Sequence, residues 1–171
     1  MFSLFYGLWK YMFSKTEFHV LILGIDKAGK TTLLEKLNGK FKTWCFWDLG
    51  GQPGLRTIWE KYFEEAHALI YVIDAACPSR FEDAKSALEK VLRHDDLQGA
   101  PLLILANKQM KLDRYLDLKK LDERVYMFEA VSAYDGMGIK ESVKRLMEVM
   151  ERSKRTEMLR ACAGVTTGRG A

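Results

Sequence analysis

The chain has 171 residues, of which 48% are hydrophobic and 29% charged, and its formal net charge is +4. These values are ordinary for one globular domain with a sizeable core. The mild positive charge, without a basic stripe, argues against a nucleic-acid partner and suits an anionic ligand or the cytoplasmic face of a membrane. Three widely spaced cysteines without a C-x-x-C pair predict reduced thiols, not a disulfide framework or a metal site.

Residues 1–16 predict an amphipathic helix. Lys10 and Lys15 lie off its apolar face, and Phe2 excludes N-myristoylation, which needs a glycine after the initiator methionine. Such a face suits a membrane surface or a protein receptor, and equally suits packing on the domain itself; the spacing leaves both open. The apolar residues recur mostly at steps of three and four: Met1, Phe2, Phe5, Leu8, Trp9, Met12 and Phe13.

The next stretch predicts a strand, a phosphate-binding loop and a helix. Residues 18–23 are an apolar, β-branched run typical of a buried strand. Residues 24–31 fit G-x-x-x-x-G-K-[ST] at every fixed position, and residues 32–37 continue as a helix that Asn38-Gly39 should end. In such a loop the backbone N–H groups turn towards a phosphate. Lys30 supplies a positive charge for the β- and γ-phosphates, and the Thr31 hydroxyl can ligate Mg²⁺.

A second predicted strand, residues 41–47, runs into the sequence Asp48-Leu49-Gly50-Gly51-Gln52. Because ligands of parallel sheets collect beyond the carboxyl ends of the strands, this segment should meet the phosphate loop. Asp48 is placed to act on Mg²⁺ through a water, the double glycine lets the backbone approach a γ-phosphate, and Gln52 can orient an attacking water.

The rest of the chain alternates between strand and helix patterns. Apolar runs predict strands over 67–74, 101–106 and 125–131, and helical spacing predicts helices over 55–63, 81–92 and 139–150. This order predicts a mostly parallel five-stranded sheet with helices on both faces, in one domain over 17–155. From Lys154 on the periodicity is lost, and residues 156–171 predict a basic, frayed tail.

Four motifs together resemble the Arf branch of the Ras-type small GTPases: G-I-D-K-A-G-K-T at 24–31, W-D-L-G-G-Q at 47–52, N-K-Q at 107–109 and S-A at 132–133. The opening Met1-Phe2 and the aromatic residues after it resemble the Arf-related group, whose members are thought to carry an acetylated N-terminus that a Golgi membrane protein recognises. The resemblance implies a P-loop small-GTPase fold. It also implies a cytoplasmic protein, peripheral on the Golgi or trans-Golgi membrane and active in vesicle trafficking.

The resemblance also implies the site. The chain would bind GTP or GDP with Mg²⁺ and hydrolyse GTP, with Lys30 and Gln52 as catalytic residues and Thr31 and Asp48 at the metal. Trp47 would face an effector or exchange factor, together with Tyr62. The residues implied around the nucleotide are Gly24, Asp26, Lys27, Ala28, Gly29, Lys30, Thr31, Thr32, Gly51, Asn107, Lys108, Ser132 and Ala133.

Two departures from the family pattern weigh against a working switch. Only residues 40–43 lie between the expected helix end and the next strand, which leaves no room for switch I, its edge strand or the threonine that completes Mg²⁺ coordination. Thr43 abuts the strand and lacks the family's Pro-Thr context. The Asp of N-K-x-D is replaced by Met110, whose thioether cannot accept two guanine N–H bonds, each worth about 1.5–3 kcal/mol when the acceptor is charged.

These departures leave two functions open. One is an Arf-related GTPase with impaired hydrolysis and switching. The other is a non-hydrolysing pseudo-GTPase module that docks through the N-terminal helix, Trp47 and Tyr62. Asp113 is a further candidate for the missing guanine acceptor, and a spliced form, a gene-model error or a diverging duplicate would each explain the two losses.

Overall fold

The computed structural model describes residues 18–108 and 126–163. The predicted helix over 1–16, Met110 and Asp113, and residues 164–171 of the predicted tail lie outside these ranges. The helices of the described residues include none that is long and apolar enough to cross a membrane. The strands are β1 (Phe18–Leu23), β2 (Trp44–Asp48), β3 (Ala68–Asp74), β4 (Leu102–Asn107) and β5 (Tyr126–Val131); the α-helices are α2 (Lys30–Leu37), α3 (Phe81–Leu92), α4 (Ile139–Glu151) and α5 (Lys154–Cys162); the 3₁₀-helices are η1 (Pro53–Tyr62), η2 (Pro78–Arg80) and η3 (Asp95–Leu97).

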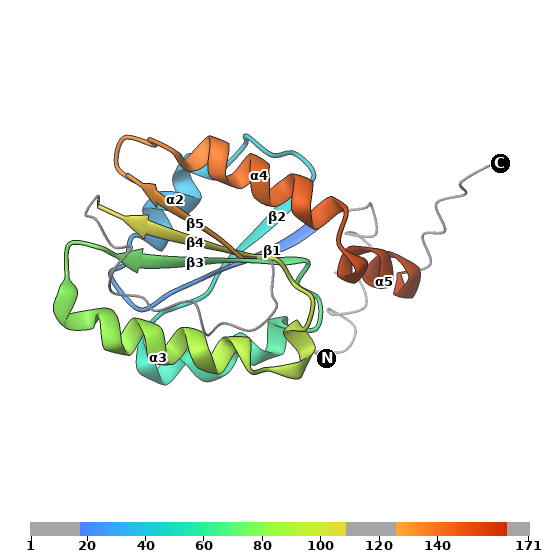
Figure 1. Ribbon diagram of the computed structural model, residues 1–171, viewed down its shortest axis with the longest axis horizontal. Coiled ribbons are helices and arrows are strands. Elements are labelled where there is room, and N and C mark those ends of the chain that lie inside the picture. The colour runs from blue at the N-terminus through green and yellow to red at the C-terminus, as the bar shows by residue number, and fades with distance from the viewer. Residues whose placement is uncertain (1–17, 109–125, 164–171) are drawn as a thin grey trace, which may run out of the picture.

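The five strands form one sheet in the order β2-β1-β3-β4-β5, and every neighbouring pair is parallel. Helices α2 and α4 cover one face, and α3 with η1 covers the other (Figure 1). The alternation of side chains along β1 supplies both layers, because Leu21 and Leu23 face α3 whereas Val20 and Ile22 face α2. The predicted α/β fold is confirmed.

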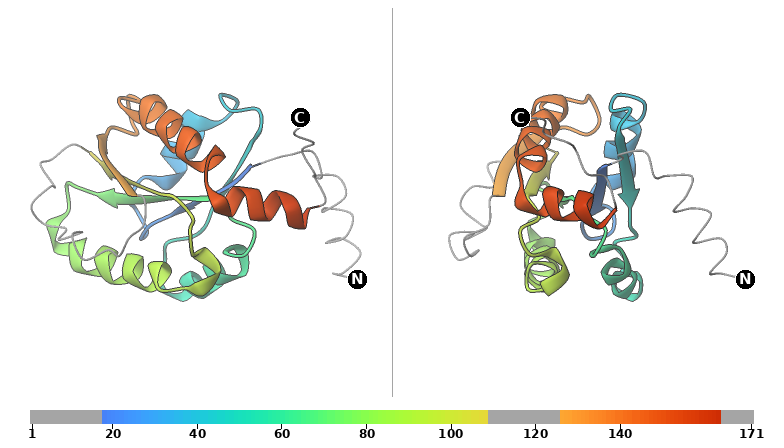
Figure 2. Two further views of the ribbon diagram at one scale, coloured as in Figure 1. Left: turned by 45° about the vertical axis from the view of Figure 1, so that its right-hand side comes forward. Right: turned by 90° about the vertical axis from the view of Figure 1, so that its right-hand side faces the viewer.

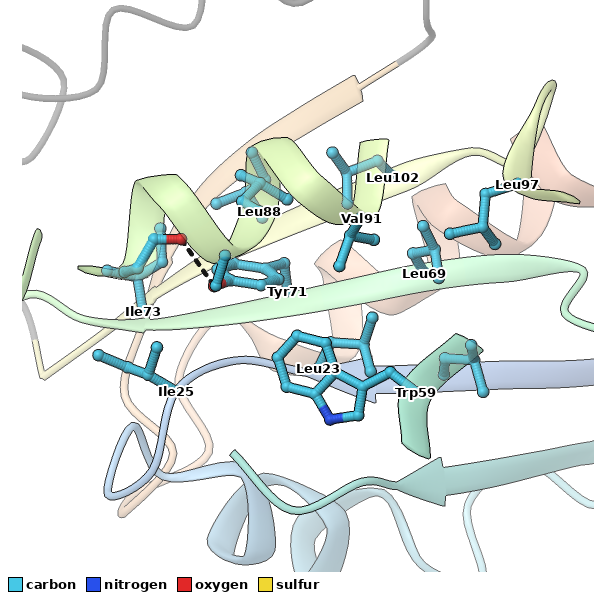
Figure 3. Close-up of a cluster of buried hydrophobic side chains, with 14 of the residues drawn as sticks. Leu23, Ile25, Trp59, Leu69, Tyr71, Ile73, Leu88, Val91, Leu97 and Leu102 are labelled. Atoms are coloured by element: carbon cyan, nitrogen blue, oxygen red, sulfur yellow. Dashed lines mark hydrogen bonds between the residues drawn. The ribbon is translucent and has the colours of Figure 1, made fainter. Parts of the chain in front are cut away.

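One of the two cores lies between the sheet and α3 (Figure 3). Tyr71 of β3 is fully buried there, and its hydroxyl donates to the carbonyl oxygen of Ala84 at 2.7 Å, so the one polar atom of the ring is satisfied. Trp59, the one buried residue of η1, packs into the same core. The expected helix over 55–63 is therefore present, but as a 3₁₀-helix that begins at Pro53.

The connection between α2 and β2 is as short as its sequence indicates. Residues 38–43 form turns, with the N–H of Lys40 bonded to the carbonyl of Leu37, and the predicted strand starts at Trp44 instead of residue 41. Strand β2 then pairs directly with β1, Ile22 opposite Asp48, and is the terminal strand of the described sheet. The edge strand that the family places before it is not among residues 38–48.

The predicted frayed tail of 156–171 is wrong over residues 156–162, which belong to α5. This helix lies beyond the amino ends of the strands (Figures 1 and 2). The buried guanidinium of Arg155 holds it there, donating to the carbonyl oxygens of Ala66 at 2.6 Å, Phe63 at 2.7 Å and Gln98 at 3.2 Å. The hydropathy pattern missed α5 because a polar side chain, not an apolar stripe, fixes it to the domain.

Replacing Arg155 with methionine should therefore lower the free energy of unfolding by about 3 kcal/mol or more, since buried carbonyl oxygens lose charged donors. Urea denaturation measures this loss. The matched control is Arg152→Met at the exposed end of α4, which should change stability by less than about 0.5 kcal/mol. Equal midpoints for the two variants would contradict the role given to Arg155.

Candidate functional site

The predicted site residues come together at the carboxyl edge of the sheet. The phosphate loop follows β1, Asp48 ends β2, Asn107 ends β4, and Ser132-Ala133 follows β5. Because all the strands run in parallel, these ends lie side by side, which is where parallel α/β sheets bind ligands.

The phosphate loop has the backbone that its glycines predict. Gly24 and Gly29 have φ values of +146° and +99°, and a Cβ would lie 2.4 Å from the Val72 carbonyl oxygen or 2.2 Å from the Asn107 side-chain nitrogen, respectively. Lys27 is also left-handed, at φ 59°. These positions turn the loop tightly over the start of α2, whose N-terminus has no side-chain cap. Its first N–H groups can therefore bind an anion.

The side chain of Lys30 lies inside this loop and links its two sides by hydrogen bonds. Its Nζ donates to the carbonyl oxygens of Gly24 and Ile25, both at 2.9 Å, and the side chain is buried. Burial lowers the pKa of the Lys30 ammonium, and the carboxylates of Asp48 and Asp26 partly offset this effect. The charge expected to meet the β- and γ-phosphates is thus held within the loop.

Thr31 and Asp48 fit a magnesium site. The Thr31 hydroxyl donates to the Asp48 carboxylate at 3.3 Å, although the two residues lie 17 positions apart. A hydroxyl and a carboxylate oxygen are hard donors of the kind that Mg²⁺ prefers. No group of three or more His, Cys, Asp or Glu within the described ranges could hold a metal alone. An Mg²⁺ ion here would therefore complete its coordination with waters and phosphate oxygens.

The segment after Asp48 packs onto the phosphate loop. A Cβ on Gly51 would lie 2.3 Å from the Gly24 carbonyl oxygen and 2.4 Å from the Asp26 nitrogen, so only glycine fits. The indole N–H of Trp59 donates to the Gly50 carbonyl oxygen at 2.9 Å and holds the segment in place. Gln52, the residue predicted to orient water, follows with an exposed side chain.

Asn107 joins the loops at the base end of the site. Its Nδ2 donates to the Ala28 carbonyl oxygen at 3.0 Å, and its Oδ1 accepts from the N–H groups of Ala133 at 2.8 Å and Lys108 at 2.9 Å. The N–H of Ala133, implied to meet the guanine carbonyl, is thus bonded to Asn107 here. Lys108 is left-handed at φ 70° and its Nζ pairs with Asp74 at 2.6 Å.

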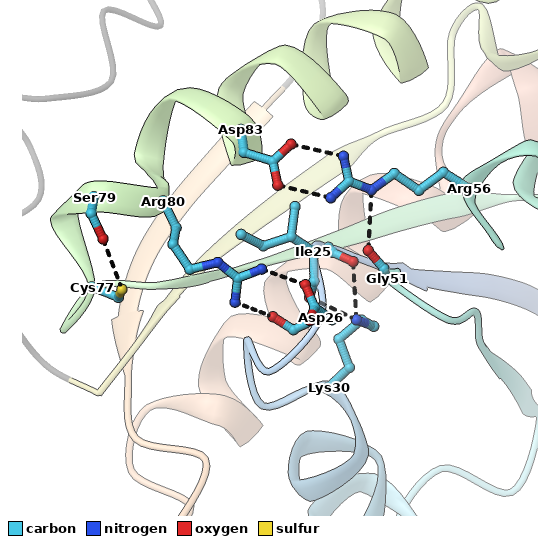
Figure 4. Close-up of polar contacts among 10 residues, drawn as sticks. Ile25, Asp26, Lys30, Gly51, Arg56, Cys77, Ser79, Arg80 and Asp83 are labelled. Atoms are coloured by element: carbon cyan, nitrogen blue, oxygen red, sulfur yellow. Dashed lines mark hydrogen bonds and ion pairs between the residues drawn. The ribbon is translucent and has the colours of Figure 1, made fainter. Parts of the chain in front are cut away.

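Sequence reasoning missed four charged residues around the phosphate loop, Arg56, Asp74, Arg80 and Asp83 (Figure 4 shows three of them). Arg80 pairs with Asp26, and Arg56 pairs with Asp83. Asp74 could have been found, because it ends β3 at the same sheet edge as Asp48. The arginine pairs join distant segments and leave no local pattern.

The fold and the phosphate loop define a P-loop nucleotide-binding domain of the small-GTPase type. The nucleotide-bound structure of the Arl6 BBS3 small GTPase from Trypanosoma brucei, solved with the analogue GppNp, superposes on it with a TM-score of 0.72 at 26% identity, over 80% of this chain and 99% of that one.

The sequence comparisons identify the family. The sequence profile described as ADP-ribosylation factor family matches residues 5–45 and 40–150. ADP-ribosylation factor-related protein 1 of rat and of human are each 36% identical over 191 residues, covering 90% of this chain and 94% of the relative. ADP-ribosylation factor-like protein 3 of Saccharomyces cerevisiae is 30% identical over 192 residues, covering 91% and 97%. The chain therefore belongs to the ADP-ribosylation factor family of small GTPases.

The contact of Gly51 with the phosphate loop gives a direct prediction. Gly51→Ala should cost about 1–3 kcal/mol of stability, because its Cβ would meet main-chain atoms that cannot move aside. Gly54→Ala is the matched control, since a Cβ there meets nothing within 4 Å. Urea denaturation of both variants measures the difference. If Gly51→Ala were as stable as Gly54→Ala, the segment would not pack on the loop as described.

Proposed function

We propose that this chain binds GTP and GDP with Mg²⁺, as an Arf-related protein of Golgi vesicle trafficking whose hydrolysis and switching are impaired. The single observation that carries nucleotide binding is the phosphate loop with Lys30 inside it and the Thr31–Asp48 pair beside it. The analogue GppNp, bound in the structure of the Trypanosoma relative, supports a guanine nucleotide as the ligand.

Hydrolysis in such a site depends on positioning and charge neutralisation. Lys30 would neutralise part of the phosphate charge, and Gln52 would orient the water. When bound at Thr31 and Asp48, Mg²⁺ would supply further positive charge to the β- and γ-phosphates.

Impaired switching follows from the connection between α2 and β2. Thr43 is the one threonine of residues 38–43, and its carbonyl oxygen accepts from the Phe18 N–H at 2.9 Å, at the amino end of β1. It is therefore separated from Asp48 by the length of β2, roughly 16 Å. Thr43 cannot act as the switch threonine in this arrangement. The two profile matches also meet at residues 40–45, and the alignments are longer than the chain, which supports a missing segment here.

Two separate features of the chain support contact with a membrane and with protein partners. The opening sequence and the mild positive charge support attachment to the cytoplasmic face of the Golgi membrane, directly or through a receptor. The rings of Trp47 and Tyr62 lie 5.2 Å apart, edge to face, and both side chains are partly exposed. This aromatic pair supports an effector or exchange-factor contact, and it also supports the alternative of a non-hydrolysing interaction module.

Calorimetric titration with GTP, GDP and ATP, with and without Mg²⁺, tests nucleotide binding. We expect Mg²⁺-dependent binding with weak preference for guanine, and we expect Met110→Asp to raise the preference for GTP over ATP at least tenfold, by restoring a charged acceptor. Met158→Asp, the same change at an exposed position of α5, should leave the preference unchanged. Absence of nucleotide binding by both the unaltered chain and Met110→Asp would refute the proposal.

Single-turnover hydrolysis of bound GTP tests the impairment. We expect the unaltered chain to hydrolyse GTP less than about tenfold faster than Gln52→Leu, because a water-orienting side chain contributes little without switch I. Gln98→Leu, at an exposed position away from the site, is the control and should match the unaltered chain. A much larger advantage of the unaltered chain over Gln52→Leu would show a working catalytic site, and tight binding without turnover would favour the interaction module.

A further inference from the structure

The phosphate loop contains a negatively charged side chain, the carboxylate of Asp26, although the ligand expected there is itself an anion. The Nζ of Lys30 donates to the carbonyl oxygen of Ile25, the residue before Asp26. The side chains of Asp26 and Lys30 are close enough for the carboxylate to raise the pKa of the Lys30 ammonium. The Asp26 nitrogen also lies against Gly51, the glycine expected to approach the γ-phosphate. Asp26 therefore lies on the side of the loop where the third phosphate would sit, and its charge opposes that phosphate.

Arg80 compensates this charge. Its Nη1 donates to the Asp26 carbonyl oxygen at 2.7 Å, and its Nη2 forms an ion pair with the Asp26 carboxylate (Figure 4). The guanidinium thus holds both the main chain and the side chain of one loop residue. The hydrogen bond from Arg80 also keeps the pKa of Asp26 below its usual range, so the carboxylate stays ionised at neutral pH and protonation does not remove its charge.

The start of α3 fixes Arg80 relative to the site. Asp83, in the first turn of this helix, accepts from both terminal nitrogens of Arg56 at 2.8 and 2.9 Å. Arg56 Nε in turn donates to the Gly51 carbonyl oxygen at 3.1 Å. One short segment, Arg80 to Asp83, therefore connects to both loops expected around the γ-phosphate (Figure 4).

We propose that Arg80 is a positioning residue for the phosphates: it neutralises Asp26, keeps the carboxylate paired, and so permits the site to accept a third phosphate. The inference rests on the proposed nucleotide-binding function and adds a determinant of the preference for triphosphate over diphosphate. The effect depends on phosphate charge and not on the base, so it can be tested separately from guanine recognition.

The test compares the dissociation constants of Arg80→Ala, Asp26→Asn and the double variant for GTP and GDP, and for tripolyphosphate and pyrophosphate as base-free probes. Arg80→Ala should weaken the binding of GTP and tripolyphosphate by roughly tenfold, and the binding of GDP and pyrophosphate by less than about threefold. The reason is that the unpaired Asp26 carboxylate repels the third phosphate most. Adding Asp26→Asn should restore binding to within about threefold of the unaltered chain. The loss should also shrink as salt is raised.

Two further variants separate charge from structure. Arg93→Ala removes one positive charge at the exposed C-terminal end of α3, away from the phosphate loop, and should change none of the four dissociation constants. Arg80→Lys keeps the charge and should retain most of the triphosphate preference. Urea denaturation of every variant verifies folding.

Equal losses for long and short ligands that Asp26→Asn does not rescue would show that Arg80 only supports the loop, and would overturn the proposal, as would unchanged binding. Failure of the unaltered chain to bind either polyphosphate more tightly than Lys30→Ala would overturn it as well. If Arg80→Ala weakened tripolyphosphate binding as expected but the unaltered chain bound GTP no more tightly than ATP, the proposed GTP function would be refuted and this inference would stand.

Discussion

The parallel pairing of β2 with β1 is the constraint on which the site depends. Ile22 lies opposite Asp48, so the carboxylate emerges at the same level as the phosphate loop and meets Thr31. The same register leaves six residues, 38–43, to return from the end of α2 to the start of β2. Six residues are enough to connect the two parallel strands, because α2 itself covers most of the distance back to the amino end of the sheet. The contact between Thr31 and Asp48 thus forms even though the connection between α2 and β2 is only six residues long.

The loops around the site are linked by hydrogen bonds between one side chain, Asn107, and main-chain atoms of each loop. Asn107 alone satisfies one carbonyl oxygen of the phosphate loop and two N–H groups of the segments that follow β4 and β5. Since each buried polar atom left without a partner costs free energy, this one side chain holds three segments to a common geometry. Gly29 is required for the same reason, because its missing Cβ is the space that the Asn107 amide occupies.

The parts of the fold with local causes were predictable from sequence. A strand that runs into G-x-x-x-x-G-K-T specifies its own turn, and the sheet-edge rule then places Asp48, Asn107 and Ala133 beside it. The parts with distant causes were not. Arg80 reaches a residue 54 positions earlier, and Arg155 binds carbonyl oxygens of segments far from it in the chain. Periodicity records which residues face a core, and it carries no information about which carbonyl oxygen a buried arginine will meet.

The arginines reveal how this domain combines rigidity with a charged ligand site. Buried carbonyl oxygens and a loop carboxylate each lie beside a fixed guanidinium, whose planar donors suit such multiple contacts. At α5 the result is a helix attached to the domain; at α3 it is a phosphate loop and a Gly51 segment attached to one helix start. The Gly51 segment is thereby held from two sides. Its main chain packs against the phosphate loop, and its carbonyl oxygen accepts from Arg56, whose guanidinium pairs with Asp83 at the start of α3.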